Sequence, residues 1–140
     1  DITWAVSQAA PLRRIKVSGD VLLQVNECYA SGGFLSNSKV DGKVDGGGQQ
    51  QWFARNSHVG AWEGVSWNVV LVGVEVEHSS PELTHKTCGT APYGPRQSVI
   101  IEDSPRVAEK PFISVSESDP SKFQLNVPQV RLASSGPNWG

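Results

Sequence analysis

Apolar positions recur along the first half of the chain at a regular spacing of 19, which Ile15, Phe34, Phe53 and Val72 share. The short segments around them are rich in β-forming residues and have Gly or Asn nearby to turn the chain. A fixed period of roughly 20 residues is typical of a solenoid, in which each coil stacks on the one before it. The column is predicted to face the interior, where replacing Phe53 by Ala would cost about 3–5 kcal/mol.

A second column has the same spacing and lies six positions further along. It aligns Val21, Val40 and Val59, and the residue before each valine is polar. The Asn-Ser pair at 37–38 recurs at 56–57. In a stack of coils, equivalent residues lie about 4.8 Å apart, so both columns predict contacts between successive coils.

The pattern predicts an all-β fold, a right-handed parallel β-helix (solenoid) with coils of about 19 residues. An ordinary β-sandwich is the alternative, because its strands also recur at short intervals. Strands of the first half are expected at residues 14–17, 33–36, 51–55 and 68–76. Strands of the second half are expected at residues 98–102, 112–116 and 123–132. Pro128 interrupts the last of them, which suits an edge strand because proline cannot donate a backbone hydrogen bond.

These elements form one predicted unit with four parts. Regular coils occupy residues 1–77, and a long proline-containing loop follows at 78–97, where the alternating pattern stops. Further strands lie within 98–133, and residues 134–140 are expected to form a polar tail. The beginning of the chain has helical propensity, which Pro11 would terminate.

Composition indicates which kinds of partner the chain can bind and in which compartment it is expected. The net charge is −2, with no cluster of Lys and Arg for nucleic acid, and the longest apolar stretch is far shorter than a membrane-spanning helix needs. Cys28 and Cys88 are an even pair in a chain rich in Gly, Ser and Pro, which favours an extracellular protein with one disulfide. Two separate buried thiols are the alternative. Because the chain has no Met and no leader-like segment, we expect that an upstream part has been removed.

Four short segments carry a family resemblance: Trp4-Ala5-Val6-Ser7-Gln8-Ala9, Ser31-Gly32-Gly33-Phe34, Gln49-Gln50-Gln51-Trp52 and Glu109-Lys110-Pro111-Phe112. They resemble segments of large secreted microbial β-helix proteins whose relatives include the β-1,3-glucanases of glycoside hydrolase family 55. The resemblance implies that the chain lies within a longer protein, with flanking coils and a second β-helix. It also implies an acid catalyst, but its surroundings match no segment of this chain, so the catalytic residues stay unknown.

Three tryptophans lie close together in the sequence, near an arginine and a glutamate. Sugar rings stack their apolar faces on aromatic side chains, and Arg and Glu bind sugar hydroxyls. The predicted sugar-contacting surface is Trp52, Trp62, Trp67, Arg55 and Glu63. The alternative is that the tryptophans pack between coils.

Other titratable residues give weaker signals. Glycoside hydrolysis needs two convergent carboxyl groups, and the carboxylates here form no diagnostic motif. These candidates are Asp41, Asp45, Glu63, Glu75 and Glu77. The set His78, Glu82, His85 and Cys88 matches no zinc spacing, so neither a metal nor a cofactor is expected.

Two functions fit these observations. The first is a part of an extracellular carbohydrate-active protein that acts on or binds a polysaccharide such as β-glucan. The second is a lectin-like or structural β-helix module without catalysis. In both, the expected partners are a polysaccharide or oligosaccharide and either the remaining coils of a parent chain or further copies of this one, because open coil ends expose unpaired strand edges.

Overall fold

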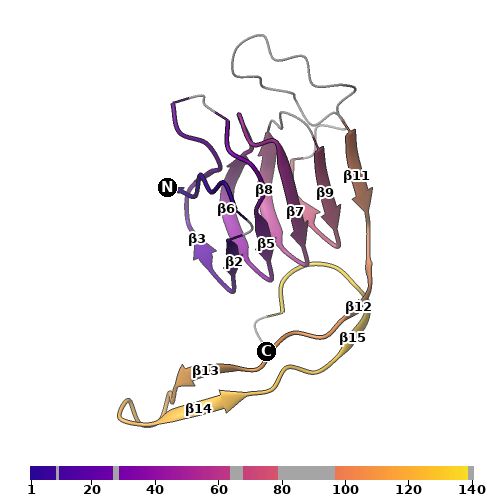
Figure 1. Cartoon of the computed structure of the whole chain (residues 1–140). Helices are drawn as coiled ribbons and strands as arrows, with labels where there is room; N and C mark the ends of the chain where they lie inside the picture. The colour runs from indigo at the N-terminus through magenta and orange to yellow at the C-terminus, as the bar shows by residue number, and fades with distance from the viewer. Residues whose placement is uncertain (9, 27–28, 64–67, 79–96, 139–140) are drawn as a thin grey trace.

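The structure is a computed structural model that describes residues 1–8, 10–26, 29–63, 68–78 and 97–138. These residues form two parallel sheets that stack as a solenoid, together with an arm of antiparallel strands that leaves it (Figure 1). The predicted parallel β-helix is therefore confirmed. In this part of the chain no helix is long and apolar enough to cross a lipid bilayer.

The first sheet contains short strands that pair only in parallel. Its hydrogen-bonded order is β1, β4, β6, β8 and β10, and β3 also pairs with β6. The bounds are β1 (Ile2–Thr3), β3 (Lys16–Val17), β4 (Val21–Leu22), β6 (Lys39–Asp45), β8 (His58–Glu63) and β10 (Glu75–Val76).

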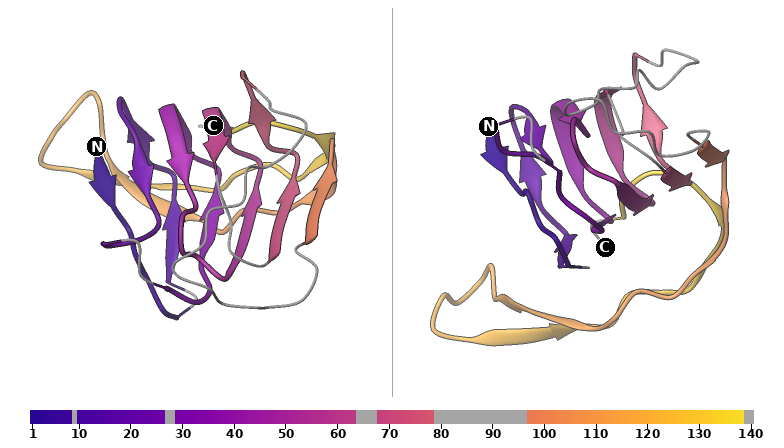
Figure 2. Two further views of the ribbon diagram at one scale, coloured as in Figure 1. Left: turned by 90° about the horizontal axis from the view of Figure 1, so that it is seen from above. Right: turned by 45° about the horizontal axis from the view of Figure 1, so that its top comes forward.

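The second sheet faces the first across the core and is also parallel. Its order is β2, β5, β7, β9 and β11, so every coil contributes the next strand (Figure 2). The bounds are β2 (Pro11–Arg13), β5 (Phe34–Ser36), β7 (Gln51–Arg55), β9 (Asn68–Val72) and β11 (Gln97–Ile101).

The arm begins directly after β11. It runs out along β12 (Ser104–Val107) and β13 (Phe112–Val115), turns, and returns along β14 (Phe123–Asn126) and β15 (Arg131–Ser134). Both pairings in the arm are antiparallel. Figure 2 shows the arm curving beneath the solenoid, with the β13–β14 hairpin at its far end.

The interior column of the second sheet differs from the predicted one. Phe34 and Phe53 are neighbours in parallel register, as the regular spacing predicts. However, the side chains that point inward are the next residues, Leu35 and Ala54, with exposed fractions of 1% and 0%. Phe53 is 37% exposed on the outer face. The interior assignment of the phenylalanine column is therefore wrong, because successive residues of a strand point to opposite faces.

The two ends of that predicted column are also out of register. Phe34 pairs with Pro11 in place of Ile15. Phe53 pairs with Val70 in place of Val72. The physical reason is unequal coil length: the coil that ends at Phe34 is longer than the one that ends at Phe53, and the coil after Phe53 is shorter.

The valine column of the first sheet is partly as predicted. Val40 pairs with Val59, and both are fully buried. Val21 instead pairs with Val44, and Val17 takes the place beside Val40. The first coil has extra residues, so Val21 belongs to the next short strand, β4, and lies beside Val44.

The recurring Asn-Ser pairs form the corner between the two sheets. Asn37 and Asn56 have positive φ angles of 50° and 43°, a conformation that Asn tolerates better than most residues. The following serines stack on one another, with the Ser38 backbone N–H donating to the Ser57 hydroxyl at 3.2 Å. The repeated pair is thus the turn of two successive coils, stabilised by a hydrogen bond between the two coils.

The helix expected before Pro11 does not form in the described residues. Ile2 and Thr3 instead make β1 alongside β4, and the Trp4 N–H donates to the Leu22 carbonyl at 2.7 Å. Pairing with a neighbouring coil outweighs the weak helical propensity of this segment.

Candidate functional site

Two tryptophans of the predicted sugar-contacting surface lie inside the solenoid. Trp52 and Trp62 are each 3% exposed and belong to the apolar core, where they pack between coils. Trp67 lies outside the described residues. A sugar ring stacks on an exposed aromatic face, and the indole rings of Trp52 and Trp62 are buried in this chain. Trp52 and Trp62 therefore follow the alternative in which the tryptophans pack between coils. Sugar contact by the five predicted residues stays a prediction.

The two charged members of that set lie on different sheets. Arg55 ends β7 in the second sheet and donates to Glu109 Oε1 at 2.7 Å. Glu63 ends β8 in the first sheet and accepts from Lys43 Nζ at 2.8 Å. This hydrogen bond raises the pKa of Lys43. The structure therefore does not bring Arg55 and Glu63 together. The predicted disulfide partners Cys28 and Cys88 both lie outside the described residues.

Glu109 is the centre of an ion cluster that sequence reasoning missed. Its side chain is 4% exposed and accepts from three arginines: Arg13, Arg14 and Arg55. The arginines come from two different coils, whereas Glu109 comes from the arm. One buried carboxylate therefore ties the arm to two coils of the second sheet, at β2 and β7, which lie on either side of β5.

The end of β15 and the residues after it cover the corner formed by Asn37 and Asn56. Asn56 Nδ2 donates to the Ser134 carbonyl at 2.9 Å, and Asn37 Nδ2 donates to the Asn138 carbonyl at 2.8 Å. The hydroxyl of Ser104 donates to Asn56 Oδ1 at 2.6 Å. The segment expected as a polar tail is thus hydrogen-bonded to the turns of the coils up to residue 138.

The far hairpin of the arm has one apolar face that is open to solvent. The cross-strand pairs Ile113–Leu125 and Val115–Phe123 are exposed by 50–74%. On the opposite face, the Arg14 guanidinium lies over the Phe112 ring at 4.4 Å. A two-stranded hairpin with an unburied apolar face is marginal in water by itself.

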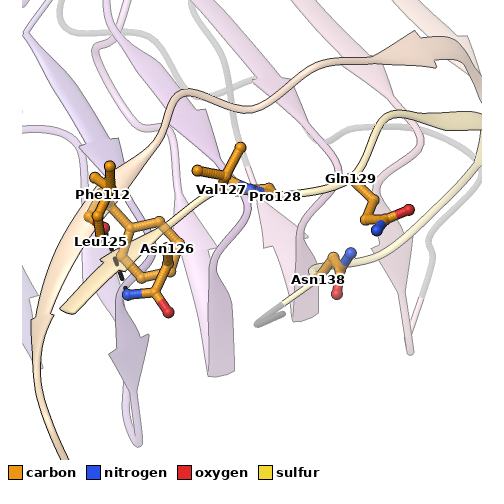
Figure 3. A pocket seen from close by; sticks show the side chains of 7 residues that line it. All are labelled: Phe112, Leu125, Asn126, Val127, Pro128, Gln129 and Asn138. Atoms are coloured by element: carbon orange, nitrogen blue, oxygen red, sulfur yellow. Dashed lines mark hydrogen bonds between the residues drawn. The ribbon is translucent and has the colours of Figure 1, made fainter.

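A hollow of about 420 Å³ lies where the hairpin joins the returning strand (Figure 3). Asn126 bridges the two strands there, donating to Ser114 Oγ at 2.9 Å and to the Phe112 carbonyl at 3.4 Å. The residues that line it are Phe112, Leu125, Asn126, Val127, Pro128, Gln129 and Asn138. This lining holds no carboxylate and therefore no candidate for acid catalysis.

A shallow groove of about 350 Å³ lies on the outer face of the second sheet. Phe53 and Val70 form its apolar strip, and the side chains of Gln51 and Asn68 stand beside them on adjacent coils. Gly33 is required here, because a Cβ at this position would lie 1.8 Å from the Trp52 ring. The groove is completed by Gly32 and the edge of Trp52.

Three of the remaining candidate carboxylates lie at the surface beside a basic side chain, and the fourth, Asp45, is 6% exposed at the end of β6. Glu75 and Glu77 flank His58, at 3.5 Å from Nδ1 and 2.9 Å from Nε2 respectively. Asp41 pairs with Lys39 at 3.6 Å. Exposed pairs of this kind contribute little to stability, and none of these carboxylates lines either of the two hollows described above. In the part of the chain that the structure describes, no three His, Cys, Asp or Glu residues are grouped to hold a metal ion.

Comparisons with known proteins identify a related segment in one enzyme. No protein-family model matches the chain. The chain is 38% identical to an exo-β-1,3-glucanase of Streptomyces sp. (strain SirexAA-E / ActE) in an alignment of 140 positions that covers 98% of this chain and 20% of that protein. It also superimposes on the structure of sacteLam55A from Streptomyces sp. SirexAA-E with a TM-score of 0.78 and 36% identity, covering 99% of this chain and 23% of that one. A variant of sacteLam55A solved in complex with glucose gives the same values. The expected relation to β-1,3-glucanase β-helix proteins is confirmed, and the chain spans about a fifth of the relative's length.

Proposed function

We propose that this chain is a segment of an extracellular β-helix protein that acts on β-1,3-glucan, in which it supplies scaffold and part of a glucan-binding surface. The main support for this proposal is that both the sequence and the fold agree with an exo-β-1,3-glucanase along nearly the whole chain. The described residues contribute coils and an arm. Among their candidate carboxylates, Asp41 and Glu63 pair with lysines, Glu75 and Glu77 lie beside His58, and Asp45 is buried. The catalytic acid is therefore assigned to a part of the protein beyond these residues.

Hydrolysis by the full-length protein tests this proposal. We expect it to release reducing sugar from a soluble β-1,3-glucan, and a β-1,4-glucan serves as the control substrate. Binding to β-1,3-glucan without any release of sugar would favour the second function, a lectin-like or structural module. If the full-length protein neither binds β-1,3-glucan nor releases sugar from it, the proposed function is wrong and only the structural role remains.

The apolar face of the hairpin supports a protein partner within the same polypeptide. The four exposed side chains of Ile113, Val115, Phe123 and Leu125 lie on one face and match a flat apolar surface. The matched relative is about five times longer than this chain, so its equivalent arm lies among further residues of one chain. We assign the occupant of the hairpin face to remaining coils of a longer chain, with self-association as the alternative outcome.

A charge substitution on this face distinguishes the two. We expect Leu125→Lys to lower the Tm of the full-length protein by several degrees, because a buried Lys loses its hydration. The same change should leave the Tm of the 140-residue chain unaltered, since Leu125 is 68% exposed there. Gln124→Lys, on the other face of the hairpin, is the matched control. A Leu125-dependent dimer of the isolated chain in size-exclusion chromatography would contradict the assignment.

A further inference from the structure

We propose that the outer face of the second sheet carries a binding strip for an uncharged glucan chain, formed by Phe34, Phe53 and Val70 and bordered by the amides of Gln51 and Asn68. This inference rests on the proposed function and adds to it a place of contact. The strands that carry the strip, β5, β7 and β9, lie side by side in Figure 1.

The Phe34 ring of the strip is held by contacts with the Phe53 ring and with two arginines. The Phe34 and Phe53 rings lie 5.4 Å apart at their centroids and are tilted by 34°. The guanidinium groups of Arg13 and Arg55 lie 5.6 and 5.9 Å from the Phe34 centroid. Both arginines are also paired with Glu109. Phe34 is therefore a fixed support, and Phe53 offers the exposed surface on which the apolar face of a sugar can stack.

The amide pair gives the strip its polar edge. Gln51 and Asn68 are direct partners in the parallel register, so their side chains stand one above the other on adjacent coils. Each amide has both donors and acceptors, which suits sugar hydroxyls, since a hydroxyl also donates and accepts. Two amides on adjacent coils suit a ligand that carries polar groups on successive units.

The charge of the lining indicates which ligand fits. The described residues that line the groove are Gly32, Gly33, Gln51, Trp52, Phe53, Asn68 and Val70, and none of them is ionisable. A phosphate or a uronic acid would find no cation in this lining, and the arginines beside Phe34 are already paired with Glu109. A neutral hexose chain needs no cation. The groove is shallow and crosses the coils, which suits an extended polymer more than an enclosed small molecule.

Affinity electrophoresis of the isolated chain in a native gel containing soluble β-1,3-glucan tests the proposal. We expect the glucan to retard the wild-type chain, and about 0.5 M added salt should not weaken binding in a parallel pull-down, because the groove is uncharged. Phe53→Ala and the double variant Gln51→Ala/Asn68→Ala should each weaken retention about tenfold. Ile113→Ala, which removes another exposed apolar side chain, is the control and should bind normally. Thermal unfolding verifies that each variant is folded.

Three results would overturn the binding strip. The first is a wild-type chain that migrates normally in glucan, and the second is a Phe53→Ala variant that is retarded like the wild type. The third is a Phe53→Ala variant that lowers the Tm of the full-length protein more than that of the isolated chain, because the strip is then covered by protein. If the full-length protein still hydrolyses β-1,3-glucan in these cases, only the strip fails. Loss of both hydrolysis and retention rejects the proposed function itself.

Discussion

Glu109→Gln is expected to lower the free energy of unfolding of the isolated chain by about 3 kcal/mol, within the roughly 3–5 kcal/mol typical of breaking a buried ion pair. Gln preserves the size of the side chain but removes its charge, which leaves Arg13, Arg14 and Arg55 without the carboxylate that they share. The arginine side chains are 17–24% exposed, so water screens part of the loss and the lower end of the range applies. Urea denaturation monitored by circular dichroism measures the change.

Glu117→Gln is the matched control for this prediction. Glu117 is an exposed carboxylate on the same arm, and the same chemical change there should alter the free energy of unfolding by less than about 0.5 kcal/mol. Equal effects of the two substitutions would mean that the cluster around Glu109 does not stabilise the attachment of the arm.

Leu35→Ala should destabilise the chain by about 2–5 kcal/mol, because it removes a side chain from the middle of the core and leaves a cavity. Leu35 is 1% exposed and lies between Leu12 and Ala54 in the inward column of the second sheet. Its neighbours belong to different coils, so the cavity would open between rungs of the solenoid. The measurement is the same urea denaturation.

Phe53→Ala provides the internal comparison for the core. The Phe53 ring is 37% exposed, so its removal should cost clearly less than Leu35→Ala, although Phe is the larger residue. A greater loss of stability for Phe53→Ala than for Leu35→Ala would show that the inward and outward columns have been assigned the wrong way round.

The solenoid was predictable because its signal is repeated. Equivalent residues of successive coils contact one another, so a similar pattern must recur wherever a new coil begins. The register between Phe34 and Phe53 and the recurrence of the Asn-Ser pair were both visible on these grounds, and the structure places that pair at the corners. The strand predicted at residues 51–55 agrees with β7 (Gln51–Arg55).

The facing of the strands was not predictable from the same pattern. In β5 and β7 the neighbouring residues Phe34 and Leu35, like Phe53 and Ala54, are all apolar, so alternation does not say which residue points inward. The regular spacing of the phenylalanines predicts their rings in the core. The structure places them outside, where arginines from β2 and β7 lie against the Phe34 ring.

The ion cluster and the groove had no local signal at all. Glu109 is far from Arg13 and Arg55 in the sequence, and it lies on the arm, outside the repeating coils. The segments with a family resemblance include Glu109 and four residues of the groove, but the resemblance indicates no contact between them. Likewise, Gln51 and Asn68 become neighbours because the coil between them is shorter than the predicted period.

The amino-acid sequence by itself determined that short strands recur with a nearly fixed period and that Asn-Ser pairs recur between them, because each such feature is local and repeated. Only the tertiary structure decided which apolar column fills the core, how the coil lengths vary, and that an arm returns to bind the corner and the arginines. These depend on unequal insertions and on pairing between distant residues. Such pairing is set by the packing of the whole chain and leaves no period in the sequence.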